Sequence, residues 1–222
     1  LKNHSCDTFT VTNHNNARSC YELQDKGYDI LTGAEFSCTV PDYNAKIHVL
    51  AYGFNPAQEE KLYKARHDIY RFQRYALDNN IPTIWAHPLY HYEEKEALSL
   101  EFFDKMSLIF ERFEVINGQR DTWQNLLVKK WVESMGSNTL EKYEKKFGIK
   151  SADYCRNPYR RAMYGGSDSH MGIFTGLTGT RLYVKKLKDR LKNESRSSLA
   201  LQALLDGDSA PFGGYNNTEK MT

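Results

Sequence analysis

Short apolar segments alternate with amphipathic helical segments along the sequence, and this alternation constrains the fold more than any other feature. Such a chain buries both kinds of segment by laying helices over a mostly parallel sheet. Strands are predicted at 8–12, 28–36, 45–54, 81–88, 112–117, 162–170 and 178–184. Helices are predicted at 17–26, along the apolar positions from Leu62 to Ala76, from about residue 93, and at 121–135, 138–147 and 198–207. About six or seven such units favour an α/β barrel of the TIM type over an open sheet.

No linker, internal repeat or low-complexity tract divides the 222 residues, so residues 1–222 are interpreted as a single domain. The glycine fingerprints GxGxxG and GxxxxGK[ST] are absent, which argues against a Rossmann or P-loop nucleotide site. The segment 185–192 is rich in lysine and arginine, and a solvated helix face is its ordinary interpretation.

Composition excludes several classes of partner. With 30 basic and 28 acidic residues, the chain has no excess positive charge for a face that binds duplex nucleic acid. No apolar run is long enough to cross a membrane. The four cysteines are scattered and form no CxxC pair, so free thiols and a cytoplasmic location are expected.

Side chains that bind metals recur at or near the ends of the predicted strands. Strand ends at the carboxyl side of a parallel barrel face one mouth, where chemistry gathers. A mixture of imidazoles and carboxylates suits zinc, manganese or iron. A single histidine of this kind is usually a core or turn residue, but convergence of all six predicts a metal site. The six residues are His14, Glu35, His48, His87, Asp168 and His170.

Other polar residues receive weaker assignments. Arg18, Arg120 and Arg181 are candidates to bind a substrate phosphate, because a guanidinium can donate two hydrogen bonds to it. Rim ion pairs are the equally good alternative for them. His4 and His67 are expected on the surface. The remaining histidine, at position 91, is a minor candidate to line the mouth.

Five segments resemble, in order, the motifs of the PHP (polymerase and histidinol phosphatase) family. They are TNHN (12–15), GAEF (33–36), KIHVLAYG (46–53), WAHP (85–88) and GSDSH (166–170). The resemblance implies a distorted (β/α)7 barrel that holds up to three divalent cations and hydrolyses phosphoesters. The segment FEVINGQRDTWQNLL (113–127) also resembles PHP proteins associated with glycosyltransferases, which suggests a glycosyltransferase as a partner.

The resemblance also implies roles for the six residues. Glu35 would bridge two cations, with His48 and His87 completing one site and Asp168 joining Glu35 at its neighbour. His14 and His170 would serve a third cation. Glu35, Asp168 and His170 would be the catalytic set, and a complete domain would hold two or three Zn, Mn or Fe ions.

Two features depart from the family pattern. No His-x-His motif precedes 8–12, so the first strand of the barrel is missing here, and we expect it upstream of Leu1. Asn13 stands where the family has aspartate and brings no negative charge to the site.

The expected function is hydrolysis of a small phosphorylated metabolite, nucleotide or sugar phosphate by a metal-bound hydroxide. Two alternatives stay open. Barrel enzymes of the amidohydrolase type use similar ligand sets, and a degenerate PHP module could bind a phosphorylated ligand or a protein partner without turnover.

Overall fold

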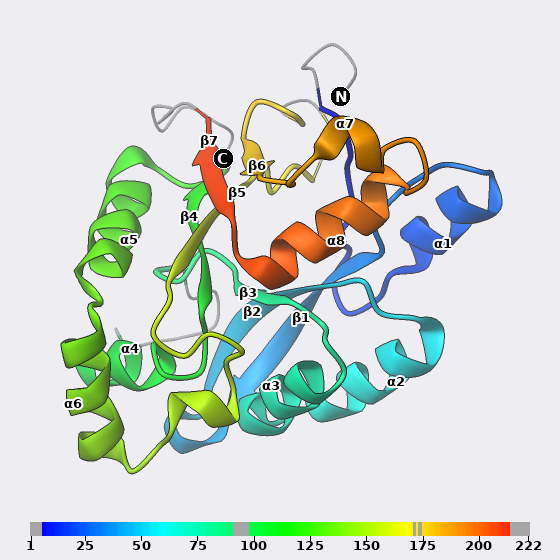
Figure 1. Cartoon of the computed structure of the whole chain (residues 1–222). Helices are drawn as coiled ribbons and strands as arrows, with labels where there is room; N and C mark the ends of the chain where they lie inside the picture. Colours follow the sequence, from blue (N-terminus) through cyan, green and yellow to red (C-terminus); the bar gives the residue numbers. More distant parts are fainter. Residues whose placement is uncertain (1–5, 91–97, 171, 173–174, 214–222) are drawn as a thin grey trace.

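The central element of the computed structural model is a five-stranded sheet with the order β1-β2-β3-β4-β5 (Figure 1). The structure describes residues 6–90, 98–170, 172 and 175–213. The strands are β1 (Gly33–Val40), β2 (Ala45–Tyr52), β3 (Thr83–Trp85), β4 (Arg112–Asn117) and β5 (Ala162–Gly166). The neighbours β3, β4 and β5 are parallel, as the alternation predicts.

The β2 strand is the exception, because it runs antiparallel to both β1 and β3. Only the 3-10 turn Pro41–Tyr43 and Asn44 connect it to β1. Asn44 has a φ of 48°, and so short a connection makes a hairpin, since a parallel crossover needs a dozen or more residues. The expectation of a mostly parallel sheet is therefore wrong for both pairs that β2 makes.

The N-terminal segment 8–14 lies beside the first residues of β1. The Leu31 amide donates to the Phe9 carbonyl at 3.3 Å, and one parallel bridge joins His14 to Glu35. The predicted strand at 8–12 is thus an extended segment with sparse pairing. The predicted strand at 28–36 begins later, so Glu35 lies near the start of β1 and not at the end of a strand.

A second, antiparallel sheet follows β5 and consists of β6 (Gly179–Leu182) and β7 (Ser209–Phe212). It is tied to β5 by side chains: the Gly165 amide donates to Thr180 Oγ1 at 2.9 Å, and Ser209 Oγ donates to the Met163 carbonyl at 2.9 Å. The α/β class is confirmed. The strand pairing recorded among the described residues is open and not a closed barrel.

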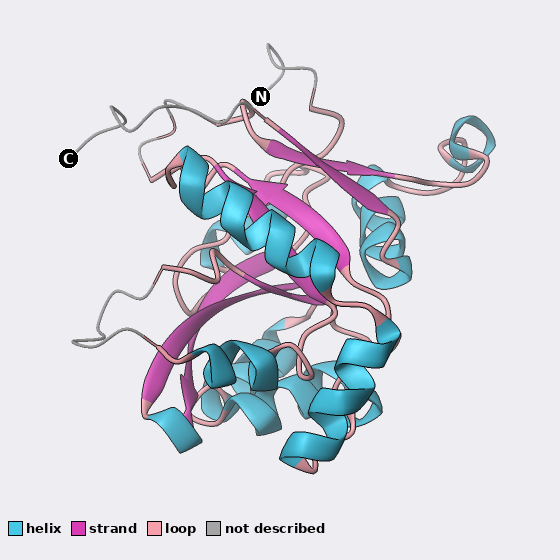
Figure 2. Cartoon of the chain, turned by 90° about the vertical axis from the view of Figure 1, so that its left-hand side faces the viewer, coloured by secondary structure: helices cyan, strands magenta, loops and turns pink. Residues whose placement is uncertain are grey.

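Helices cover the strands, which Figure 2 shows as a curved layer. They are α1 (Arg18–Asp25), α2 (Pro56–Ala65), α3 (Ile69–Asp78), α4 (Leu100–Met106), α5 (Thr122–Ser134), α6 (Ser137–Phe147), α7 (Leu187–Arg190) and α8 (Arg196–Asp206), with a 3-10 turn at Ser151–Asp153. None of the described helices is both long enough and apolar enough to span a membrane. Cys20, Cys38 and Cys155 are buried as free thiols, as expected.

The predicted single helix from Leu62 to Ala76 is two helices, α2 and α3. The carboxyl group of Asp68 accepts the Tyr70 amide at 2.9 Å and the Arg71 amide at 3.3 Å, which starts a new helix. Both helices bury their apolar positions, so the hydrophobic periodicity continues across the break.

Two apolar clusters pack against the sheet. The larger one lies between the sheet and the helices and contains large side chains such as Phe36, Trp85 and Phe113. The smaller one joins the inner face of the strands to α8 through residues such as Leu50, Tyr164 and Leu204. Helix α8 crosses in front of the strands in Figure 1.

Candidate metal centre

A cavity of about 730 Å³ lies at the carboxyl ends of the parallel strands. Segment 8–14 borders it on one side and residues 164–170 on the other, and residues of α8 contribute to its floor. Of the six predicted metal ligands, five line this cavity: His14, Glu35, His87, Asp168 and His170. The sixth, His48, contacts Glu35 and His87 directly. Asp168 and His170 share the cavity but belong to no group of three potential metal donors among the described residues.

Glu35, His48 and His87 form the closest group. The hairpin register pairs Ser37 with His48, which puts the His48 and Glu35 side chains on the same face of the β1–β2 pair. Glu35 Oε1 lies 2.6 Å from His48 Nδ1 and 3.3 Å from His87 Nε2. The two imidazole nitrogens are 3.3 Å apart. Three potential ligand atoms therefore point at one small volume.

Electrostatics favour a positive charge between these groups. Burial would raise the pKa of Glu35, but hydrogen bonds from His48 and His87 hold it well below the usual carboxyl range. Burial alone would lower the pKa of His87, yet the Glu35 hydrogen bond and nearby carboxylates raise it above its ordinary value. An anionic carboxylate with two imidazoles is the donor chemistry that zinc and manganese take. His87 Nδ1 is buried with no hydrogen-bond partner among the described residues.

His14 extends the group on the side of segment 8–14. Ligand atoms of His14, Glu35 and His48 all lie within 4.8 Å of one another. The His14 ring centre is 5.1 Å from that of His48 and 6.2 Å from that of His170. This set shares both Glu35 and His48 with the first, so His14 is the one donor that it adds.

Asp168 and His170 sit at the mouth of the cavity. Asp168 Oδ2 accepts hydrogen bonds from Arg120 Nη2 at 3.1 Å and Asn117 Nδ2 at 3.2 Å. His170 is largely exposed and contacts the backbone carbonyl of Asp168 at 3.0 Å through Nδ1. Asp168 has a φ of 47°. Residues other than glycine rarely adopt this conformation, and those that do are concentrated at functional sites.

Glu114 is the site residue that the sequence analysis missed. Its Oε2 accepts the His87 amide at 2.9 Å and Asn117 Nδ2 at 2.9 Å. The carboxylate holds the backbone of His87, whose φ is 30°. Burial raises the pKa of Glu114 to about 7, against opposing contributions from His87 and Asn117. The available signal was a lone acidic residue inside the apolar strand RFEVIN.

The three candidate arginines have different surroundings. Arg120 is bound to Asp168, which lines the cavity, and its guanidinium lies 3.4 Å above the centre of the Tyr90 ring. Arg18 is exposed on α1 and pairs with Glu22 at 2.8 Å, away from the cavity. Arg181, on β6, also lies away from the predicted position at the cavity. Strand alternation turns its neighbours into the cavity and turns Arg181 outward, where it lies 5.7 Å from the Phe212 ring centre.

The remaining predicted positions add little to this site. His67 is exposed, as expected, in the connection between α2 and α3. The basic segment forms the short helix α7, whose Arg190 pairs with Glu194. His4 and the histidine at position 91 lie outside the described residues.

Comparisons with known proteins identify no family for the chain. No protein-family model matches the chain, and no curated protein matches it at a significant level. Among solved structures, a candidate metal-dependent phosphoesterase from Bifidobacterium adolescentis is similar, with a TM-score of 0.48, 11% identity and coverage of 76% of this chain and 79% of that chain. An amidohydrolase from Chromobacterium violaceum, solved with sulfate and without metal, has a TM-score of 0.44, 12% identity and coverage of 76% and 80%. At these TM-scores and identities the likenesses establish neither a family nor a function, so the function is argued from the site.

Proposed function

We propose that this protein is a metal-dependent hydrolase that cleaves a phosphoester of a small molecule. The observation that carries the proposal is the convergence of Glu35, His48 and His87 on one volume at the edge of a 730 Å³ cavity. A divalent cation held there would polarise a phosphoryl oxygen and lower the pKa of a water nucleophile to about 7. We also propose that the curved sheet, segment 8–14 and the β6–β7 pair form a distorted, incompletely closed barrel.

The residues around the cation positions have distinct tasks in this proposal. Glu35 supplies the shared negative charge, and its low pKa keeps it ionised at neutral pH. Glu114 orients His87 through the backbone amide, as outer hydrogen-bond partners orient metal ligands elsewhere. Asp168, which lines the same cavity, would join a neighbouring cation if Arg120 released it.

Arg120 favours a phosphoester over an amide as the substrate. Its Nε is buried and has no hydrogen-bond partner among the described residues, while Nη2 contacts Asp168. A guanidinium that contacts a carboxylate of the cavity lining can turn to the oxygens of a phosphate bound there. Neutral amides offer no comparable negative charge.

The test is hydrolysis of p-nitrophenyl phosphate by the purified protein with Mn²⁺, Zn²⁺ or Fe²⁺ added separately. p-Nitroacetanilide is assayed in parallel as the amide substrate. We expect phosphate release that requires a cation and falls by more than about 100-fold in Arg120→Ala, because the transition state carries additional charge. The exposed Arg18→Ala serves as the matched control and should keep full activity.

Three outcomes decide between the functions. Cation-dependent phosphate release with no amide cleavage supports the proposal. Amide cleavage alone would assign the chain to the amidohydrolase type of chemistry. Cation binding without turnover of either substrate would favour a binding module.

A further inference from the structure

A second polar cleft opens beside the metal centre, on the same face of the β1–β2 hairpin. Its volume is about 310 Å³. We call it the outer cleft, and it is lined by Ser37, Thr39, Lys46, Arg66, His67 and Tyr90, together with the metal-centre residue His48. Because His48 belongs to both places, the outer cleft begins where the metal centre ends.

Strand register explains how the two places are connected. On the inner face of the hairpin, Glu35 pairs with Leu50, Ser37 with His48 and Thr39 with Lys46. Residues two apart on a strand share a face and are separated by about 6.5–7 Å. The metal centre occupies the first two of these rows, and the outer cleft occupies the last two. A molecule bound to the cation and lying along the hairpin therefore reaches Thr39 and Lys46 within about one further row.

The outer cleft has the charge of an anion site. Lys46 and Arg66 are cations, His67 can become one, and no carboxylate belongs to the described residues that line the cleft. Arg66 Nε is buried and has no hydrogen-bond partner among the described residues. Hydroxyl groups of Ser37 and Thr39 add neutral donors.

The position of Arg66 is fixed by its surroundings. Its backbone carbonyl accepts the Thr39 amide at 2.8 Å, which ties the α2–α3 connection to β1. Its guanidinium lies 4.3 Å from the centre of the Tyr63 ring, a stacking contact that limits the side chain's freedom. A cation held in place beforehand loses less entropy when it binds an anion.

We infer that the outer cleft binds a second anionic group of the substrate, a phosphate or a carboxylate, while the phosphate to be cleaved lies at the metal centre. The inference rests on the proposed function for the identity of the first group. It narrows the substrate class to small molecules with two anionic groups separated by about one or two rows of the hairpin.

The test compares matched substrates that differ only in the second group. 1,3-Propanediol bisphosphate and 4-(phosphonooxy)butanoate are assayed against propyl phosphate, with Mn²⁺ present. We expect kcat/KM to be about 10- to 100-fold higher for a substrate with the second anion, the range of a charged hydrogen bond. Arg66→Ala should remove this advantage and leave propyl phosphate hydrolysis within about twofold, whereas Arg18→Ala should change neither. The better of the two doubly charged substrates identifies the second group as phosphate or carboxylate.

Binding without turnover separates this inference from the proposed function. Calorimetry measures the affinity of 1,3-propanediol bisphosphate for the protein in EDTA, with and without Arg66→Ala. If no phosphoester is hydrolysed but Arg66→Ala still weakens this binding about tenfold, the proposed function fails and the anion cleft stands. If the bisphosphate shows no kinetic advantage over propyl phosphate and Arg66→Ala leaves its binding unchanged, the outer cleft is not an anion site.

Discussion

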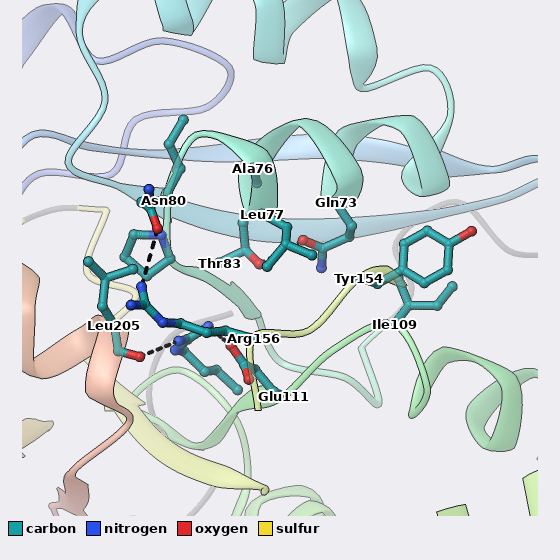
Figure 3. A pocket seen from close by; sticks show the side chains of 13 residues that line it. Gln73, Ala76, Leu77, Asn80, Thr83, Ile109, Glu111, Tyr154, Arg156 and Leu205 are labelled. Carbon is teal, nitrogen blue, oxygen red and sulfur yellow. Dashed lines mark hydrogen bonds and ion pairs between the residues drawn. The ribbon is translucent and has the colours of Figure 1, made fainter. Parts of the chain in front are cut away.

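The two ends of the parallel strands both bury charged groups, but they use them differently. At the amino end of β4, Arg112 Nη1 pairs with Glu111 Oε1 at 2.5 Å, and Arg112 also donates to the carbonyls of Leu204 and Leu205. Glu111 Oε2 accepts the Asn157 amide at 2.6 Å. The cavity there is only about 60 Å³ (Figure 3). Each charge at this end thus has partners that tie β4 to α8 and to the chain before β5.

The carboxyl end differs most clearly in the size of its cavity. Its cavity is more than ten times larger, and two buried donors, His87 Nδ1 and Arg120 Nε, lack partners among the described residues. Two of its residues, His87 and Asp168, have positive φ. Unpaired donors and backbone strain persist only where the surrounding structure enforces them, and they concentrate at functional sites. The amino end also has buried donors without partners among the described residues, Gln73 Nε2 and Arg161 Nε, and a positive φ at Asn80. The two ends therefore differ in the size of the cavity and in the ligand atoms that converge at the carboxyl end.

The largest expected effect is a loss of activity on neutralising Glu35 at the carboxyl end. Glu35→Gln removes the shared negative charge and should lower cation-dependent phosphatase activity by about 1000-fold or more, since a neutral amide is a poor ligand for both cation positions. The glutamine side chain has the same shape but loses the charge-assisted hydrogen bonds from His48 and His87, so circular dichroism checks that the variant is folded at the assay temperature. Steady-state kinetics and metal analysis measure the loss, with the exposed Glu60→Gln as control. Activity within tenfold of the wild type would remove Glu35 from the metal centre.

The next largest effect is a loss of stability on removing the Arg112 side chain at the amino end. Arg112→Ala leaves Glu111 as an unpaired buried charge and strands two helix carbonyls, so the free energy of unfolding should fall by about 3–5 kcal/mol. The kcat of the molecules that remain folded should stay within about twofold. Urea denaturation measures the stability. Arg156→Ala, on the rim of the same cavity and bonded to Asn80 at 3.2 Å, is the matched control and should cost less than about 1 kcal/mol.

A titration sharpens the contrast between the ends. The pKa of Glu114 is about 7 in the folded chain, above its ordinary value of 4.5, so the folded state holds a proton that the unfolded state releases. The free energy of unfolding should therefore fall as pH rises from about 4.5 to about 7, by up to about 3 kcal/mol. Glu114→Gln has no such proton to lose.

Urea unfolding in EDTA across pH 4.5 to 8 measures this, and the informative quantity is the wild-type value minus the Glu114→Gln value. Added Mn²⁺ should flatten the difference, because a nearby cation favours the ionised carboxylate. A constant difference across this range would show that Glu114 is ionised throughout.

Local pattern predicts some of these elements closely and others poorly. The strand at 112–117 matches β4 residue for residue, because a short apolar run between polar segments has few alternatives. Hydrophobic periodicity does not separate α2 from α3, because the spacing of apolar residues continues across the break. The break itself comes from the Asp68 side chain, which caps the first turn of α3. The antiparallel β2 was within reach of the sequence, because eight residues between 36 and 45 cannot hold a crossover.

The site follows the same division. Residue type and order indicate that His14, Glu35, His48 and His87 gather, because these side chains recur at strands of one sheet. The order of residues along the chain does not show which face a strand turns to the cavity. The sequence analysis therefore included Arg181, whose side chain points outward. The sequence does not identify Glu114, because its role depends on a contact with the His87 amide, which is distant along the chain.

The smallest expected effect tests whether Glu114 positions His87. A Cβ at Gly166 would lie 2.5 Å from Glu114 Oε1, so Gly166→Ala must displace a carboxylate that is bonded to the His87 amide. We expect about a tenfold loss of activity, the low end for changes in outer ligand partners, and about 1–2 kcal/mol of stability. At Gly136 an added Cβ meets nothing within 4 Å, and Gly136→Ala should leave activity unchanged. Full activity in Gly166→Ala would mean that the position of His87 is set by its own strand and turn, independently of Glu114.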